Sequence, residues 1–156
     1  MFRLLQGDVG SGKTIIALLS AYNTINSGYQ VAFMAPTEIL ARQHYNLAKE
    51  IFPGSKKIEL ISGKSDYKNK KIILDKLKNN KIDIIFGTHA IFQKKVSYKK
   101  LGLIIIDEQH KFGVNQRKKL SDKGGDDCDV LLMTATPIPR TLTMTMYGDM
   151  DLSIIK

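Results

Sequence analysis

The feature that most constrains the fold of this chain is a glycine-rich stretch close to its first residue. Residues 7–14 read GDVGSGKT and fit the pattern G-x-x-x-x-G-K-[ST]. In that pattern the glycines let the backbone turn so that several N–H groups point at one anion. The helix that follows directs the positive end of its dipole at the same place. A phosphate-binding loop of this kind needs a strand before it and a helix after it.

The residues on either side of the loop supply that strand and that helix. The apolar run FRLLQ precedes the loop, and apolar residues recur at helical spacing after it until Gly28, which is expected to end the helix. We therefore expect Lys13 to reach the β- and γ-phosphates of a nucleotide and the Thr14 hydroxyl to bind Mg²⁺. The residues expected to contact the nucleotide are Gly7, Asp8, Val9, Gly10, Ser11, Gly12, Lys13 and Thr14.

The rest of the chain alternates between short apolar runs and helical stretches. Strands are expected over 2–6, 31–35, 58–61, 83–86, 102–106 and 130–134, with another possible strand just before Lys156. Helices are expected over 13–27, 38–51, 65–79, about 112–121 and 137–147. The strands are apolar throughout, as in strands that are buried on both faces. The alternation predicts an α/β fold with a mostly parallel central sheet, helices on both of its faces, and a ligand at the carboxyl ends of the strands.

Length and composition exclude several classes of protein. The chain has 156 residues, which suffices for one domain with its own core. Cys128 is the only cysteine, which excludes an internal disulfide and a cysteine cluster for zinc. No apolar run approaches the ~20 residues that a membrane helix needs, and the first residues lack the layout of a signal peptide. We expect a cytoplasmic protein with no membrane partner.

The positive charge is concentrated in one part of the sequence. Thirteen lysines and only four acidic residues lie between Lys56 and Lys100, which accounts for the net charge of +9. Such a region suits an anionic partner such as nucleic acid. It is equally typical of the solvated face of a lysine-rich helix, and both interpretations stay open.

A second stretch of the sequence carries acidic residues at the end of a strand. LGLIIIDEQH (101–110) is a buried type of strand that ends in two acids. A P-loop nucleotidase needs an acid at the tip of a neighbouring strand to hold Mg²⁺, and Asp107 fits that role. Glu108 is placed to orient or deprotonate the attacking water. An acidic turn after a strand is also common without any catalytic role, but the upstream loop favours the catalytic set Lys13, Asp107 and Glu108.

These two motifs together resemble those of superfamily 2 helicases, and further stretches agree. The stretches are APTEILARQH (35–44), GTHAIF (87–92), LLMTATPIPRT (131–141) and DEQHKFGVNQR (107–117). The last of them narrows the resemblance to the branch that contains RecG-type fork-remodelling helicases, over nearly all 156 residues. The resemblance implies a RecA-like P-loop NTPase motor domain that uses ATP and Mg²⁺. Such a motor remodels branched DNA, at replication forks and Holliday junctions, in DNA repair and recombination.

The resemblance also implies roles for particular residues. Those that would contact the DNA backbone are Pro36, Thr37, Arg42, Gln43, Gly87, Thr88 and His89. Those that would couple hydrolysis to DNA movement are Gln109, His110, Thr134 and Thr136. These segments also have structural interpretations that stay open. Thr37 suits the capped start of a helix, His89 suits a structural histidine whose hydrogen bonds are satisfied, and Thr134 and Thr136 suit a turn before Pro137.

The resemblance further implies that residues 1–156 are a single motor domain of a longer protein. Nothing in the sequence matches the second motor domain, which would close the ATP cleft and supply an arginine, or the upstream DNA-wedge domain. One alternative is the motor of the transcription-repair coupling translocase. Others are a P-loop kinase or small-molecule ATPase and a non-catalytic nucleotide-binding module, although these leave PTEILARQH and TATPIPRT unexplained.

Overall fold

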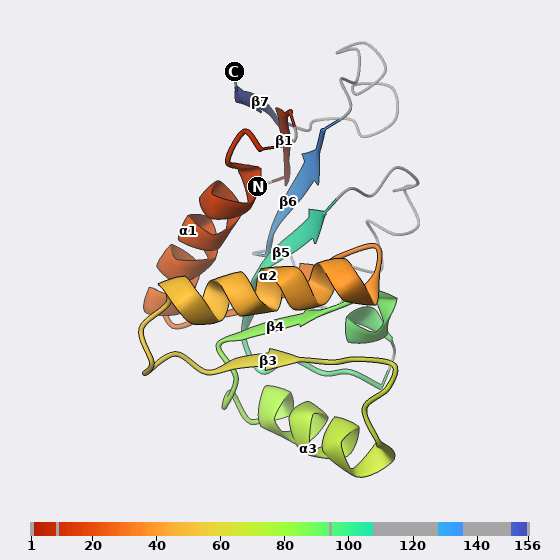
Figure 1. Cartoon of the computed structure of the whole chain (residues 1–156). Coiled ribbons are helices and arrows are strands. Elements are labelled where there is room, and N and C mark those ends of the chain that lie inside the picture. The colour runs from red at the N-terminus through yellow and green to blue at the C-terminus, as the bar shows by residue number, and fades with distance from the viewer. Residues whose placement is uncertain (1, 9, 94, 108–127, 136–150, 156) are drawn as a thin grey trace.

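A parallel sheet of seven strands forms the centre of the computed structural model, which describes residues 2–8, 10–93, 95–107, 128–135 and 151–155 (Figure 1). The strands are β1 (Phe2–Gly7), β2 (Gln30–Met34), β3 (Ile58–Leu60), β4 (Ile84–Gly87), β5 (Leu101–Asp107), β6 (Asp129–Thr134) and β7 (Asp151–Ile155). Their order is β3-β4-β2-β5-β6-β1-β7, and every pair in the described residues is parallel. The structure confirms the predicted α/β fold, including the possible strand before Lys156.

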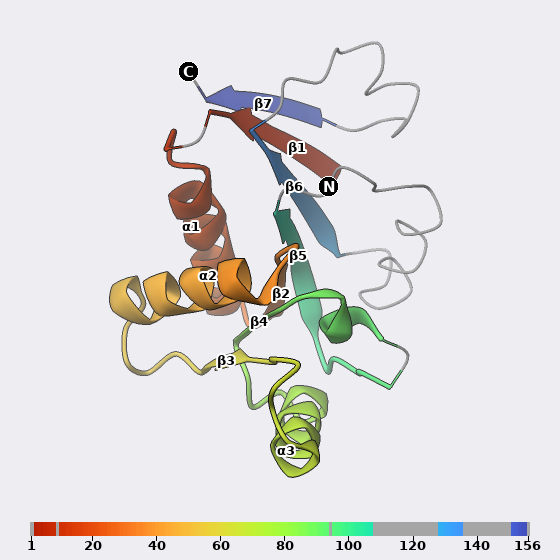
Figure 2. The same ribbon diagram turned by 45° about the vertical axis from the view of Figure 1, so that its right-hand side comes forward.

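Helices cover both faces of the sheet, as the alternation predicts (Figures 1 and 2). They are α1 (Lys13–Asn26), α2 (Glu38–Ile51), α3 (Tyr67–Lys78) and the 3₁₀ helix η1 (His89–Phe92). Helices α1 and α2 pack with one core cluster, and α3 and η1 pack with the other. The three α-helices match the predicted ranges to within two residues, whereas the predicted helices at 112–121 and 137–147 lie outside the described residues. In that described part of the chain, no helix has the length and apolar character needed to cross a membrane.

The starts of the helices follow from their capping residues. The Thr37 side chain accepts a hydrogen bond from the Leu40 N–H (3.2 Å), and the Asp66 side chain accepts one from the Asn69 N–H (2.7 Å). Helix α1 differs, because its N-cap is Gly12 in the left-handed conformation and no side chain caps it. The first N–H groups of a helix have no partner within the helix, so this uncapped start suits an anion.

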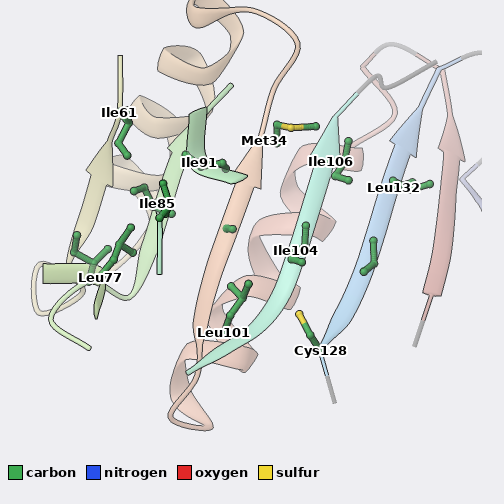
Figure 3. Packing of buried hydrophobic residues seen from close by; sticks show 14 of the residues in the cluster. Met34, Ile61, Leu77, Ile85, Ile91, Leu101, Ile104, Ile106, Cys128 and Leu132 are labelled. Carbon is green, nitrogen blue, oxygen red and sulfur yellow. The ribbon is translucent and has the colours of Figure 1, made fainter. Parts of the chain in front are cut away.

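The core consists of alternate side chains of the central strands, which point to opposite faces of the sheet. Phe33 and Phe86 lie side by side under α1 and α2, with ring centroids 5.1 Å apart, and neither is exposed. On the other face, residues such as Met34, Ile104 and Ile106 form the second cluster (Figure 3). Burial on both faces explains why the strands are apolar without alternation.

Gln30 is a polar exception in this core, at the amino end of β2. It is 1% exposed, and its amide nitrogen donates to the Leu77 carbonyl (3.0 Å) and the Ile82 carbonyl (3.1 Å). Its side-chain oxygen accepts from the Lys100 N–H (3.0 Å). One buried amide therefore joins the end of α3, the approach to β4 and the start of β5.

Replacing Gln30 with leucine should destabilise the fold. Gln30→Leu keeps an apolar stem but removes three hydrogen bonds to backbone groups, which at about 1 kcal/mol each predicts a loss of about 3 kcal/mol in the free energy of unfolding. Gln43→Leu is the matched control, because Gln43 is exposed on α2 and its change should stay within about 0.5 kcal/mol. Urea unfolding measures both, and coincident curves would contradict the structural role of Gln30.

Candidate functional site

Those predicted functional residues that the structure describes gather along one edge of the sheet. Because the strands are parallel, all their carboxyl ends open onto the same edge. The glycine-rich loop follows β1, Thr134 ends β6 and Asp107 ends β5. Met133 of β6 pairs with Leu5 of β1 on one side and with Asp107 of β5 on the other. The next residue of β6, Thr134, pairs with Gln6 of β1. Only β6 therefore separates the strand of the loop from the strand of the acid.

The loop itself has the backbone that its glycines predict. Gly10 and Gly12 have φ values of 82° and 96°, and a Cβ at either position would meet open space. These positive φ values favour glycine. At Gly7 a Cβ would instead come within 2.5 Å of the Ser11 hydroxyl oxygen, so the first glycine is needed for close approach.

The charged group of Lys13 lies inside the turn of the loop. The Lys13 ammonium donates to the Gly7 carbonyl (2.6 Å) and to the Asp8 carbonyl (3.1 Å), and the residue is 8% exposed. The Ser11 hydroxyl is buried nearby and has no hydrogen-bond partner among the described residues. A buried polar group without a partner points to a missing partner such as a ligand oxygen. The cation, the hydroxyl and the uncapped helix start together fit a phosphate group.

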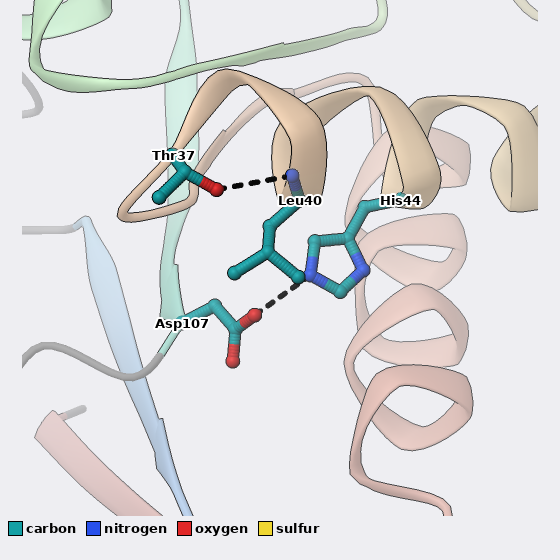
Figure 4. A network of polar contacts seen from close by, with 4 residues as sticks. All are labelled: Thr37, Leu40, His44 and Asp107. Atoms are coloured by element: carbon teal, nitrogen blue, oxygen red, sulfur yellow. Dashed lines mark hydrogen bonds and ion pairs between the residues drawn. The ribbon is translucent and has the colours of Figure 1, made fainter.

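Asp107 is buried at the carboxyl end of β5 and contacts a histidine from α2. One carboxylate oxygen of Asp107 lies 2.7 Å from Nε2 of His44 (Figure 4). An ionised carboxylate can only accept a hydrogen bond, so the imidazole Nε2–H donates. The His44 ring packs on Phe33 with centroids 4.8 Å apart.

Sequence reasoning did not place His44 in the site, although it ends the stretch APTEILARQH. A signal was nevertheless present in the helical spacing. Ala41, His44 and Ala48 recur at intervals of three and four and form the buried face of α2. A polar residue on a buried face needs a partner, but the sequence does not say which residue provides it.

The two segments expected to contact DNA lie next to each other. Strands β2 and β4 are paired, and the Ala35 N–H donates to the Gly87 carbonyl (2.9 Å). Pro36, Arg42 and His89 are exposed, and so are Thr37 and Gln43, whereas Thr88 is half-buried and Gly87 buried. The Thr37 hydroxyl caps α2, and the carboxylate of Glu38 accepts from the Gly63 N–H, which ties the loop after β3 to the same edge. Sequence reasoning had not singled out Glu38.

Several predicted residues lie outside the described part of the chain. They are Val9, Glu108, Gln109, His110 and Thr136. Within the described ranges, no group of three or more histidine, cysteine, aspartate or glutamate side chains is placed to hold a metal ion. Burial raises the pKa of the Cys128 thiol to about 12, so this thiol stays protonated and is a poor nucleophile.

A separate cavity of about 310 Å³ lies at the opposite, amino edge of the sheet. Its lining comes from the end of α1, the loop to β2 and the first residues of β5 and β6. The lining residues are Asn23, Thr24, Ser27, Tyr29, Gly102 and Asp129. None of the predicted site residues contributes to it, so the cavity is distinct from the carboxyl-edge site.

Comparison with known proteins gives consistent matches. Residues 3–145 match the family DEAD/DEAH box helicase. The chain is 54% identical to the ATP-dependent DNA helicase RecG of Streptococcus pneumoniae over 99% of its length, and 53% identical to that of Borreliella burgdorferi over 100%. A solved structure of RecG bound to a three-way DNA junction covers 99% of the chain with 43% identity and a TM-score of 0.82. The chain spans 23% of each curated relative and 21% of the solved chain.

Removal of the Lys13 ammonium should weaken nucleotide binding. A hydrogen bond to a charged group contributes about 1.5–3 kcal/mol, so Lys13→Ala should lower the affinity for ATP and ADP by roughly 10- to 100-fold in the presence of Mg²⁺. The control is Lys78→Ala, which removes the same charge from the exposed face of α3. Isothermal calorimetry measures both variants, and equal affinity of Lys13→Ala and wild type would rule out the phosphate-binding loop.

Proposed function

Since the chain belongs to the DEAD/DEAH box helicase family, we propose that it is the ATP-binding motor domain of a RecG-type DNA helicase. In this proposal residues 1–156 form a single RecA-like motor half. A second RecA-like domain of the same polypeptide and a DNA-wedge domain belong to the longer protein. The motor couples ATP hydrolysis to the remodelling of branched DNA in repair and recombination. The named relatives are bacterial, which supports a place in the bacterial cytoplasm.

The observation that carries the proposal is the convergence of the loop and the acid at one edge. The loop that leads to Lys13 follows β1 and Asp107 ends β5, so only β6 separates their strands, and both residues lie at the carboxyl edge. The 54% identity to a RecG helicase along the chain supports the choice within the family. A kinase or small-molecule ATPase would leave the stretches PTEILARQH and TATPIPRT without a role.

The residues of this chain then take the following roles. The glycine-rich loop and the start of α1 bind the phosphates of ATP, and Lys13 binds the β- and γ-phosphates. Thr14 and Asp107 would hold Mg²⁺, which would supply positive charge against the negative charge that develops on the phosphates. Glu108 orients the attacking water and takes its proton. Gln109, His110, Thr134 and Thr136 connect this chemistry to DNA movement.

DNA binds along the other part of the carboxyl edge, at the ends of β2 and β4. Hydroxyl, guanidinium and backbone N–H groups there suit phosphate oxygens and carry no base specificity. The exposure of several side chains supports this surface. The exposed residues are Pro36, Thr37, Arg42, Gln43 and His89, and Gly87 and Thr88 lie beside them. The three-way junction in the solved RecG relative supports a branched substrate.

The two acids should have separable effects in the full-length protein. Glu108→Gln should bind ATP with Mg²⁺ but hydrolyse it at least 100-fold more slowly, because positioned proton transfer contributes about 10²–10⁴ in rate. Asp107→Asn should also require more Mg²⁺ for half-maximal turnover. Steady-state ATPase assays over a range of Mg²⁺ concentrations separate the two effects. Near wild-type turnover in both variants would contradict the catalytic assignment.

DNA binding should be indifferent to sequence and sensitive to salt. Arg42→Ala should weaken binding of a labelled junction and reduce the slope of log affinity against log salt by about one, as expected for one lost phosphate contact. The comparison variant replaces the lysines of α3 at 68, 70, 71, 76 and 78 with glutamine. Fluorescence anisotropy reports both. A larger loss of affinity in the lysine variant than in Arg42→Ala would indicate that DNA binds along α3 and not at the ends of β2 and β4.

The isolated chain should bind nucleotide but hydrolyse it at a rate near background, with or without DNA. An arginine supplied to the γ-phosphate contributes about 10³–10⁵ in rate. Of the four arginines in the sequence, Arg3 lies at the amino end of β1, 3.8 Å from Asp151, and Arg42 is exposed on α2, whereas Arg117 and Arg140 lie outside the described residues. Restoring the second motor domain covalently should raise turnover steeply. DNA-stimulated hydrolysis by residues 1–156 alone would instead favour a self-contained ATPase.

A further inference from the structure

The Asp107 carboxylate is held by a histidine that belongs to a different element of the fold. The carboxylate ends β5, and the partner His44 lies on α2, 63 residues earlier in the chain. Both residues are buried, with 7% and 8% of their surfaces exposed. The distance of 2.7 Å between Nε2 and the carboxylate oxygen is short for a hydrogen bond, and hydrogen bonds to a carboxylate are stronger than those between neutral groups.

The imidazole has little freedom to turn away from the acid. Its ring packs on Phe33, which is fully buried beneath α2 and stacks in turn on Phe86. The helix that carries it is fixed at its start by the Thr37 cap and by the contact from Glu38 to Gly63. The packing therefore sets the direction in which Nε2 points, and the carboxylate lies in that direction (Figure 4).

A carboxylate that binds a metal ion is usually oriented by a hydrogen bond from a residue that does not touch the metal. Asp107 has two oxygens, and the His44 N–H engages one of them. Fixing one oxygen limits rotation of the carboxylate, so the entropy lost when the acid binds an ion is reduced. A histidine with a purely structural role would make the same contact. The two roles differ in one measurable effect, because only a histidine that orients the carboxylate changes the affinity for Mg²⁺ when it is replaced.

We propose that His44 is a positioning residue that holds the Asp107 carboxylate in the orientation in which it binds the magnesium ion of the nucleotide. The inference rests on the proposed function, because it requires Asp107 to be a magnesium ligand. His44 itself contacts neither nucleotide nor metal in this account.

The test compares two variants of His44 in the full-length protein. His44→Phe keeps an aromatic ring on Phe33 but has no N–H for the acid. His44→Gln loses the ring and keeps an amide N–H at a similar distance from the backbone. The affinity for a fluorescent ADP is measured without Mg²⁺ and then over a series of Mg²⁺ concentrations, which gives a Mg²⁺ midpoint for each protein.

We expect all proteins to bind ADP within about twofold of each other in the absence of Mg²⁺. The Mg²⁺ midpoint of His44→Phe should rise by about 10-fold or more, as for the loss of other groups that orient metal ligands. The Mg²⁺ midpoint of His44→Gln should lie closer to that of the wild-type protein. Thermal unfolding checks the fold, and if His44→Phe is unfolded then His44→Asn, whose amide is too short to reach the acid, replaces it.

Three results would overturn the proposal. A midpoint of His44→Phe within twofold of wild type would make the contact structural only. A midpoint below wild type would mean that His44 competes with the ion. Equal shifts in His44→Phe and His44→Gln would exclude the N–H as the cause. If the affinity of the wild-type protein for ADP does not change with Mg²⁺ concentration, the proposed role of Asp107 is refuted before any variant of His44 is compared.

Discussion

Parallel pairing of β1, β6 and β5 is the constraint on which the rest of the structure depends. It brings the glycine-rich loop and Asp107 to one edge although about 95 residues separate them in the sequence. The pairing is stable because these strands bury apolar side chains on both faces, such as Leu131 and Leu132 in opposite clusters. A slip of one residue would exchange the two faces and move Asp107 away from its place, so the core also sets the geometry of the site.

The carboxyl edge has two parts that meet where β5 pairs with β2. The ends of β1, β6 and β5 carry the loop, Thr134 and Asp107, and the ends of β2 and β4 carry the proposed DNA segments. Helix α2 takes part in both. Its exposed face carries Arg42 and Gln43, and its buried face directs His44 to Asp107. One rigid helix therefore lies between the proposed DNA surface and the proposed magnesium ligand.

Most of the fold could be predicted from the sequence, because apolar runs and helical spacing are local signals. The helix starting at Lys13 and the strand ending at Asp107 were both found in this way. The contacts of His44 and Gln30 could not be, because each joins residues far apart in the chain and depends on strand order. The same holds for the neighbouring position of Pro36 and Gly87, which requires the pairing of β2 with β4. The hydroxyl of Thr37 has a capping role that the sequence left open beside a DNA contact.

The central proposal is that nucleotide binds at the carboxyl edge and that the acid of β5 takes part. Amide NMR shifts of the protein on addition of ADP and Mg²⁺ test this most directly, because each described residue reports separately. We predict the largest changes at Gly10, Lys13 and Thr14, with further changes at Asp107 and Thr134 that require Mg²⁺. Changes centred on the residues that line the cavity at the amino edge, with Lys13 and Asp107 unaffected, would contradict it.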